Sequence, residues 1–481
     1  MTKPHEMLTW SAQAIAAAIR DGRLTSKQAL KAHYDYMDEV NPSLNAVVFF
    51  RREEAEAEAR AADERIAAAR ENGTVDQLPP LLGVPCTIKE NFAFVGTPQA
   101  SGLLARAHVV NDHDAPTVAR LREAGAIPMG VTNTSELCMW MESYNKVYGM
   151  TNNPYDVKRT VGGSSGGEGA IIGSGASPFG LGADVGGSIR MPAFFNGTFG
   201  HKPSPLLIPN EGQYPAAHGE ANRILGTGPL CRRAEDLEPL VRVLAGDQAH
   251  RLRNPAEVSF DQLRVITVEP ERGPRMSADQ RSARDRAVQA LVARGARAET
   301  VDLPAMNKAF DIWSSMLAEA NTENSFGDMM FGSKNPLRGA GELLRLMIGR
   351  SPHTLPLIVL AMIERAGEFA PRRHRRLVQL GEDLKARLHD LLGEDGVLVH
   401  PPYPTVAPKH YKALWPPFNF VHCAIFNTMQ VPSTSVPMGL DGKGVPTGVQ
   451  VVAAPEFDHL GIACALALEA DCGGWVPPWT R

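Results

Sequence analysis

The sequence predicts an α/β protein that forms one large domain, and three observations support this prediction. Hydrophobic residues account for 43% and charged residues for 21% of the 481 residues, so the chain can bury enough apolar surface to offset the conformational entropy lost on folding. Strand-like and helix-like segments alternate from 82 to 131, which is typical of α/β proteins. No stretch has the composition of a linker between independent domains, so the domain is expected to span 1–481.

The chain is expected to begin with two helices between 11 and 40, where apolar positions recur at helical spacing. Thr25 and Gln28 form a capping-box pattern ahead of the second helix. The next segment, 51–72, is rich in Ala, Glu and Arg, which favours a long and mostly solvated helix that ends at Gly73.

The core is expected to start with a strand over 82–92, a helix over 117–124 and a strand over 126–131. Gly and Ser dominate the segment 161–200, but apolar residues interrupt them at intervals. This pattern indicates ordered structure rather than a flexible linker, so the segment belongs to the core.

A helical region is expected over 304–392, where the sequence is rich in Met, Leu and Arg and prolines divide it into short pieces. Such a region suits a cap over the core. Short strands at 397–399, 434–438 and 449–452 and a helix over 460–471 are expected to complete the chain.

Charge and cysteine usage exclude several classes of protein. The formal net charge of −4 supplies no global positive field to attract nucleic acid. The six cysteines occur singly, without a C-x-x-C pair, which indicates reduced thiols. The N-terminus lacks the order of a signal peptide, and the apolar stretch 355–363 is much shorter than the ~20 residues that cross a bilayer. We therefore expect a cytoplasmic protein with no nucleic-acid partner and no transmembrane segment.

Two glycine-rich clusters hold serines where the backbone can approach a ligand closely. Residues 162–168 read Gly-Gly-Ser-Ser-Gly-Gly-Glu and contain Ser164, and residues 184–190 read Asp-Val-Gly-Gly-Ser-Ile-Arg and contain Ser188. Such serines suit an attack on a carbonyl, with neighbouring N–H groups receiving the oxyanion. Lys89 lies on an otherwise apolar strand, where desolvation favours the neutral amine that a base requires.

Other interpretations of these residues remain open at this stage. The first cluster also satisfies the nucleophile elbow G-x-S-x-G through Ser164, which would require a later Asp and His. A flexible loop and a solvated Lys89 are the structural alternatives. No phosphate-loop motif is present, and residues 111–114 match no standard zinc or calcium spacing, so no metal is expected.

In combination these residues resemble the amidase signature family, and most closely its fatty acid amide hydrolases. The likeness to the family rests on Lys89 in I-K-E-N, Ser164 in G-G-S-S-G-G-E-G-A and Ser188 in G-A-D-V-G-G-S-I-R-M-P. The likeness to the fatty acid amide hydrolases rests on Glu168, which follows the double glycine, and on the ending Gly473-Gly474-Trp475-Val476-Pro477-Pro478. The family resemblance implies a central mixed β-sheet flanked by helices, with a signature core over about 82–205 and the helical cap over about 304–392.

The resemblance also implies roles for the site residues. Ser188 would attack the carbonyl, Ser164 would relay its proton and Lys89 would accept it, with a cis peptide between Gly163 and Ser164. The N–H groups of Val185, Gly186, Gly187 and Ser188 would form the oxyanion hole. The two charged residues of the same cluster, Asp184 and Arg190, would orient the backbone. Ser165 is expected to cap the following helix with Glu168.

The acyl pocket is expected to be lined by soft, adaptable side chains, which suit a long or irregular acyl group. The resemblance to fatty acid amide hydrolases implies that Cys138, Met139, Trp140 and Met141 line it, and Met329, Met330 and Phe331 are expected to close it from the cap.

The function expected from these features is that of a serine hydrolase without cofactor or metal, which cleaves aryl or fatty acyl amides through an acyl-enzyme. Its partner would be a small-molecule amide substrate, and a homodimer is left open. Cleavage of carbamates or esters by the same residues is one alternative, because only the leaving group differs. The amidotransferase component of a tRNA-dependent complex is an alternative of another class.

Overall fold

The computed structural model describes residues 6–269, 271–272, 274–320, 326–331, 336–363, 370–414 and 418–480. These residues form an eleven-stranded sheet in the order β1-β3-β2-β6-β8-β7-β12-β13-β11-β9-β10. The strands are β1 (Val47–Phe50), β2 (Pro85–Lys89), β3 (Ile127–Thr132), β6 (Phe179–Asp184), β7 (Phe199–Lys202), β8 (Gly226–Cys231), β9 (Arg264–Val268), β10 (Arg297–Val301), β11 (Gly396–His400), β12 (Ser433–Leu440) and β13 (Pro446–Ala453). Strands β2 and β3 run parallel whereas β6 and β8 run antiparallel, so the predicted mixed sheet is confirmed.

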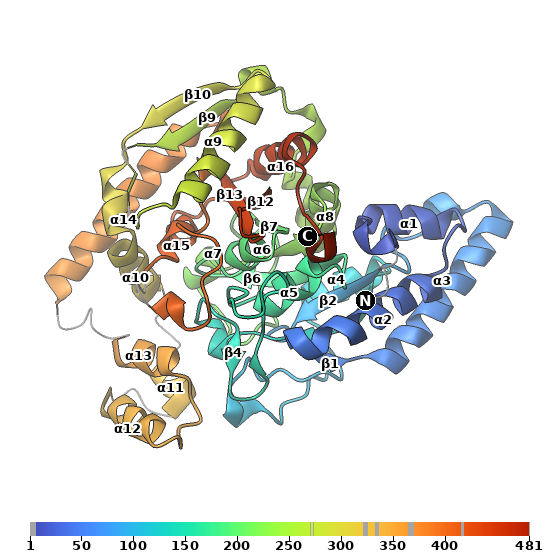
Figure 1. Cartoon of the computed structure of the whole chain (residues 1–481), viewed down its shortest axis with the longest axis horizontal. Helices are drawn as coiled ribbons and strands as arrows, with labels where there is room; N and C mark the ends of the chain where they lie inside the picture. The colour runs from blue at the N-terminus through green and yellow to red at the C-terminus, as the bar shows by residue number, and fades with distance from the viewer. Residues whose placement is uncertain are drawn as a thin grey trace.

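Helices flank the sheet (Figure 1). They are α1 (Ala12–Arg20), α2 (Ser26–Leu44), α3 (Arg52–Asn72), α4 (Pro116–Glu123), α5 (Gly166–Gly173), α6 (Arg190–Phe195), α7 (Ala221–Ile224), α8 (Leu237–Ala245), α9 (Ala278–Ala293), α10 (Ala309–Ala320), α11 (Phe326–Phe331), α12 (Pro336–Met347), α13 (Leu355–Ile363), α14 (Pro371–Leu392), α15 (Val421–Thr428) and α16 (Asp458–Cys472). The alternation of strands and helices predicted for 82–131 is present as β2, α4 and β3.

Both faces of the sheet pack against apolar clusters. On β11, Val397 and Val399 belong to one buried cluster and Leu398 belongs to another. This alternation follows from strand geometry, because successive side chains point to opposite faces. The sheet is therefore buried on both sides, and the site residues at its strand ends are placed inside the protein.

The helix ends follow the local signals in the sequence. Gln28 N donates to Thr25 Oγ1 at 3.1 Å and Thr25 N donates to Gln28 Oε1 at 2.9 Å, so the predicted capping box of α2 is confirmed. Helix α3 ends at Gly73, which has φ +69°, a conformation that glycine adopts without steric cost.

The capping box predicted for Ser165 and Glu168 is wrong. Ser165 Oγ makes no cap hydrogen bond and instead donates to Ala183 O at 3.2 Å. Glu168 is fully buried and accepts hydrogen bonds from side chains of the sheet. Every residue of α5 is buried, so packing between the helix and the sheet outweighs the local capping preference.

The segment expected to form one helical cap divides into two parts. Helices α10 and α14 pack on the sheet through Ile312, Met316 and Leu384, in the same cluster as Ile266 of β9. Helices α11, α12 and α13 form a smaller group at the lower left of Figure 1. None of the described helices is long and apolar enough to span a bilayer.

The small group is attached to the body through a buried carboxylate. Glu136 Oε1 contacts His353 Nδ1 at 2.8 Å, and Glu136 Oε2 accepts a hydrogen bond from Thr354 N at 2.7 Å, just before α13 begins. Leu357 and Ile358 of α13 pack with Leu137 beside this contact. The group is therefore tied to the segment that leads into Cys138.

Substituting Trp475 by Ala is expected to lower the free energy of unfolding by about 3–5 kcal/mol, as large-to-small core changes do. Trp475 is buried, and its Nε1 donates to Gly173 O at 3.0 Å, which ties the C-terminal segment to the end of α5. Chemical denaturation measures the change. The exposed Val110→Ala control should cost less than about 0.5 kcal/mol, and equal losses in both variants would contradict this role for Trp475.

Candidate active site

Lys89 is the last residue of β2, and its side chain is completely buried. Its Nζ donates a hydrogen bond to Ser164 Oγ at 2.7 Å. Burial lowers the pKa of the Lys89 ammonium, because a charge is costly away from water, and Cys138, Asp184 and Glu168 oppose this shift. The structure thus brings the predicted lysine and the first predicted serine into direct contact.

A buried carboxyl group, that of Glu168 on α5, belongs to the same site. It accepts hydrogen bonds from Thr87 Oγ1 at 2.7 Å and Thr132 Oγ1 at 2.8 Å. Thr87 shares a face of β2 with Lys89, and Thr132 pairs with Lys89 across the β2–β3 ladder. Burial raises the pKa of Glu168 to about 8, while the two hydroxyl donors and the charge of Lys89 oppose the shift.

Sequence reasoning missed this cluster. The available signal was the two-residue spacing of Thr87 and Lys89 on one strand, which places both side chains on the same face. The sequence does not reveal that α5 turns Glu168 toward that face.

Ser164 is held by backbone contacts on both sides. The peptide between Gly163 and Ser164 is cis, as the family resemblance implies. A Cβ on Gly163 would lie 2.4 Å from Trp140 O, so only glycine fits there. Ser143 Oγ donates to Gly162 O at 3.0 Å and lies 3.1 Å from Ser164 O, and it accepts from Gly166 N at 3.0 Å.

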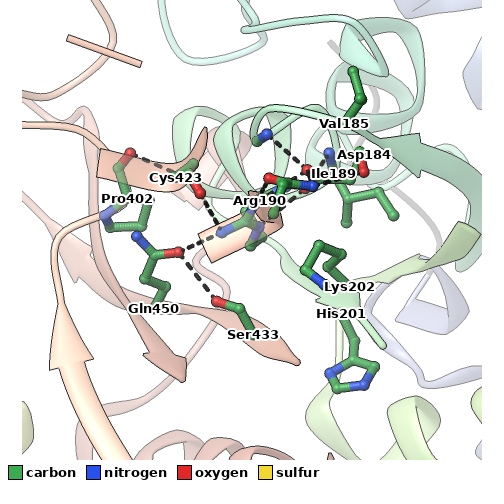
Figure 2. Close-up of polar contacts among 12 residues, drawn as sticks. Asp184, Val185, Ile189, Arg190, His201, Lys202, Pro402, Cys423, Ser433 and Gln450 are labelled. Atoms are coloured by element: carbon green, nitrogen blue, oxygen red, sulfur yellow. Dashed lines mark hydrogen bonds and ion pairs between the residues drawn. The ribbon is translucent and has the colours of Figure 1, made fainter. Parts of the chain in front are cut away.

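A buried ion pair organises the second serine cluster (Figure 2). Arg190 Nε lies 3.0 Å from Asp184 Oδ2, and both side chains are fully buried. The N–H groups of Gly187 and Ile189 donate to the same carboxylate at 2.6 and 3.1 Å. Burial alone would raise the pKa of Asp184, but the Arg190 charge and these donors outweigh it and hold the pKa well below its usual range. The carboxylate therefore stays ionised and shapes the loop around Ser188.

Arg190 also connects this loop to distant parts of the chain. Its Nη1 donates to Gln450 Oε1 of β13 at 2.9 Å and to Cys423 O of α15 at 3.0 Å, and its Nη2 donates to Asn427 Oδ1 at 2.5 Å (Figure 2 shows Gln450 and Cys423). Sequence reasoning assigned no role to Gln450 or to Asn427. No local pattern signals partners that lie so far along the chain.

Ser188 lies at the turn between β6 and α6 and is 6% exposed. Its carbonyl accepts from Ser165 N at 3.1 Å, which joins the two serine clusters. Its hydroxyl makes no hydrogen bond to Ser164 or to any other described residue. Gly187 has φ +106°, and a Cβ there would lie 2.5 Å from Cys423 Cβ, so this position requires glycine.

The four predicted oxyanion donors do not share one environment. The N–H of Gly187 is donated to Asp184, as described above. The N–H groups of Val185, Gly186 and Ser188 have no acceptor among the described residues. These three N–H groups are therefore free to donate to a bound ligand.

A cavity opens at Lys89 and Ser164. Its lining is mostly apolar and comprises Lys89, Asn91, Leu137, Cys138, Met139, Ser164, Ala183, Asp184, Val185, Gln213, Pro215, Ala216, Ala217, Ala221, Leu225, Leu317 and Met329. Cys138, Met139 and Met329 of the predicted acyl pocket contribute to this lining.

The other predicted pocket residues lie elsewhere. Met141 packs in a buried cluster with Phe194, and Trp140 packs at its edge. Met330 and Phe331 pack within the cluster of α13. Gly186, Gly187 and Ser188 follow Val185 on the loop without contributing to the described lining.

The described residues include no group of three or more His, Cys, Asp or Glu side chains that could hold a metal ion.

A family model described as Amidase matches residues 28–460. The chain belongs to the amidase family. The family resemblance predicted from the motifs is thereby confirmed.

Individual relatives of this amidase span nearly its full length. Fatty-acid amide hydrolase 2-A of Danio rerio is 43% identical over 484 residues, which cover 98% of this chain and 90% of that protein. Fatty-acid amide hydrolase 2 of Homo sapiens is 41% identical over 488 residues, which cover 99% and 91%. A glutamyl-tRNA(Gln) amidotransferase subunit of Lachnospira eligens is more distant, at 27% identity over 465 residues, which cover 93% and 95%.

A solved structure of fatty acid amide hydrolase superimposes on this amidase with a TM-score of 0.80. The superposition covers 99% of this chain and 87% of the other, at 21% sequence identity. At this identity the likeness supports the fold alone.

Substituting Asp184 by Asn is expected to lower the free energy of unfolding by about 3–5 kcal/mol, because it leaves the buried Arg190 charge without its partner. A matched control is Asp35→Asn, which breaks the exposed pair between Lys31 and Asp35 and should cost less than about 1 kcal/mol. Denaturation curves of both variants provide the comparison. An Asp184→Asn protein as stable as the control would disprove the organising role of this pair.

Proposed function

We propose that this enzyme is a serine hydrolase that cleaves carboxylic amide bonds through an acyl-enzyme on Ser188. The observation that carries the proposal is the buried hydrogen bond between Lys89 Nζ and Ser164 Oγ in the lining of a mostly apolar cavity. A base buried in this way, beside a loop with unpaired N–H donors and a serine, suits nucleophilic attack on a carbonyl. Membership of the amidase family supports an amide as the bond that is cleaved.

In the first half of the reaction, Ser188 Oγ attacks the carbonyl carbon and its proton passes to Ser164 Oγ. The proton of Ser164 passes in turn to the neutral Lys89 amine. The N–H groups of Val185, Gly186 and Ser188 stabilise the oxyanion. The tetrahedral intermediate collapses when the Lys89 ammonium returns a proton through Ser164 to the leaving nitrogen, which departs as the amine.

In the second half, water attacks the acyl group on Ser188 and gives up a proton through Ser164 to Lys89. The intermediate expels the Ser188 alkoxide, which recovers the proton along the same route, and the carboxylic acid leaves. Burial supports this role for Lys89 because it lowers the pKa of the ammonium and so increases the fraction of neutral amine.

The cavity supports an acyl group of apolar character. Its wall includes Leu137, Met139, Leu317 and Met329, which are flexible or branched apolar side chains. We therefore propose fatty acyl or aryl amides as the substrate class, in keeping with the names of the relatives that are 43% and 41% identical to this chain.

Carbamates and esters are further candidates, because attack and acyl transfer on Ser188 would be the same for them. The role of an amidotransferase component has weaker support, since the relative with that name is only 27% identical. Hydrolysis of a simple anilide by the isolated chain would separate these functions, because a component of a tRNA-dependent complex would require its partners.

Ser188→Ala is expected to abolish labelling by a fluorophosphonate and to lower kcat/KM for amides by about 10⁴-fold or more, because it removes the nucleophile. Ser164→Ala should leave slow residual turnover. Ser177→Ala is a matched control at a buried serine outside the cavity, and it should retain labelling. Labelling and rate measurements test this, and a label on Ser164 in the wild-type enzyme would overturn the assignment.

The amide kcat/KM is expected to rise with pH along one limb whose midpoint lies below about 10.4, the ordinary pKa of lysine. Burial lowers the pKa of Lys89, and only its neutral form accepts a proton, so activity falls as the pH drops below that pKa. Lys89→Ala should flatten the limb and lower the amide rate by about 10³-fold or more, with a smaller effect on esters.

Two controls accompany the pH profile. Burial raises the pKa of Glu168 to about 8, so this carboxyl group also titrates below the ordinary pKa of lysine, and Glu168→Gln distinguishes the two groups. This variant should keep the limb and move its midpoint to lower pH, because a carboxylate near Lys89 favours the ammonium. A Lys89→Ala enzyme that keeps the limb and most of its amide activity would exclude lysine as the base.

A further inference from the structure

A chain of buried hydrogen bonds runs from the backbone to the wall of the cavity, and its direction can be derived. Asn210 Nδ2 lies 3.0 Å from Asn222 O and 3.0 Å from Leu225 O. Backbone carbonyls only accept hydrogen bonds, so the amide NH₂ of Asn210 must face them. The Oδ1 of Asn210 is therefore turned the other way, toward Thr227.

The hydroxyl of Thr227 transmits this orientation. Thr227 Oγ1 donates to Asn210 Oδ1 at 2.7 Å, which uses its single proton. Its other contact, with Gln213 Nε2 at 2.7 Å, must therefore be one in which Thr227 accepts. The amide of Gln213 is fixed as a result, with Oε1 facing Asn91, and it accepts from Asn91 Nδ2 at 3.1 Å.

Asn91 is the last member of this chain. Because its Nδ2 donates to Gln213, its Oδ1 is the free end of the network. This Oδ1 is buried and has no hydrogen-bond partner among the described residues, and the Asn91 residue is only 2% exposed. Buried acceptors in proteins are nearly always paired, so an acceptor held in one orientation without a partner requires an explanation.

The position of Asn91 supplies that explanation. Asn91 and Gln213 line the same cavity as Lys89 and Ser164. Asn91 follows Lys89 closely in the chain, where β2 ends. The lining is otherwise mostly apolar, so the Asn91 amide is one of the few polar groups in the wall that also contains Lys89 and Ser164.

We propose that Asn91 Oδ1 accepts a hydrogen bond from the N–H of the scissile amide and so makes the enzyme selective for amides that carry an N–H. The inference rests on the proposed function, because it assigns the leaving-group side of that reaction. The substrates favoured are primary and secondary amides, over tertiary amides and esters.

The physical reason lies in the geometry of the leaving nitrogen. In the tetrahedral intermediate this nitrogen is pyramidal, and only its lone pair can receive the proton that Ser164 delivers. Holding the N–H against Asn91 turns the lone pair toward Ser164. Asn91 gains and loses no proton itself, and an ester oxygen, which has no N–H and two lone pairs, requires no such orientation.

The test compares three substrates with the same acyl group: an anilide, its N-methyl anilide and a phenyl ester. Asn91→Leu removes the acceptor at similar volume. We expect kcat/KM for the anilide to fall about 10- to 100-fold more than for the other two substrates. Equal losses for all three substrates, or no loss for the anilide, would overturn the proposal.

A second variant tests the direction of the network without touching Asn91. Thr227→Val replaces the hydroxyl by a methyl group of similar shape, so Gln213 and Asn91 lose their fixed orientation. The anilide should again lose more activity than the ester, by a smaller factor. The matched control Asn254→Leu changes an exposed asparagine outside the cavity and should leave all three rates unchanged.

Fluorophosphonate labelling separates a failure of this inference from a failure of the proposed function. If the Asn91→Leu enzyme is labelled and its ratio of anilide to ester kcat/KM equals that of the wild type, the role of Asn91 alone is overturned. Wild-type enzyme that is not labelled on Ser188 and cleaves none of the substrates would overturn the proposed function and the inference together.

Discussion

The buried ion pair between Asp184 and Arg190 is the interaction on which the organisation of the site depends. Two charges removed from water are costly unless each is matched and fully hydrogen-bonded, and here both conditions are met. The carboxylate accepts the N–H groups of Gly187 and Ile189, and the guanidinium donates to Gln450 and Asn427. The loop that carries Ser188 is therefore tied to β13 and α15.

This arrangement divides the backbone donors of the loop into two sets. The N–H of Gly187 donates to Asp184 and so helps to hold the loop in place. The N–H groups of Val185, Gly186 and Ser188 have no acceptor among the residues that the structure describes. The glycines make this division possible, since a side chain at Gly187 would collide with Cys423. Rigidity on one side of the loop and free donors on the other support the oxyanion site proposed above, because such donors must be preorganised.

At Lys89 and Glu168, burial acts on groups that would be charged in water. It favours the neutral amine of Lys89 and the neutral carboxyl of Glu168, while their mutual attraction favours the charged pair. Thr87 and Thr132 satisfy the carboxyl group in either state, because hydroxyls can donate or accept. The hydrogen-bond network that ends at Asn91 reaches the wall of the same cavity.

Several features were determined by the sequence alone, because their causes are local. The capping box of Thr25 and Gln28 depends on residues within one helical turn. The placement of Lys89 on a buried strand depends on its apolar neighbours, and the mixed sheet was implied by the family motifs.

Other features were decided only by the tertiary structure. Local reasoning assigned Glu168 to a helix cap, but packing of α5 against β2 and β3 turned it toward Thr87 and Thr132. The partners of Arg190 and the direction of the hydrogen bonds that end at Asn91 also depend on residues far away in the chain. The physical reason is that strand order and helix packing bring distant residues together, and no local spacing encodes which donor meets which acceptor.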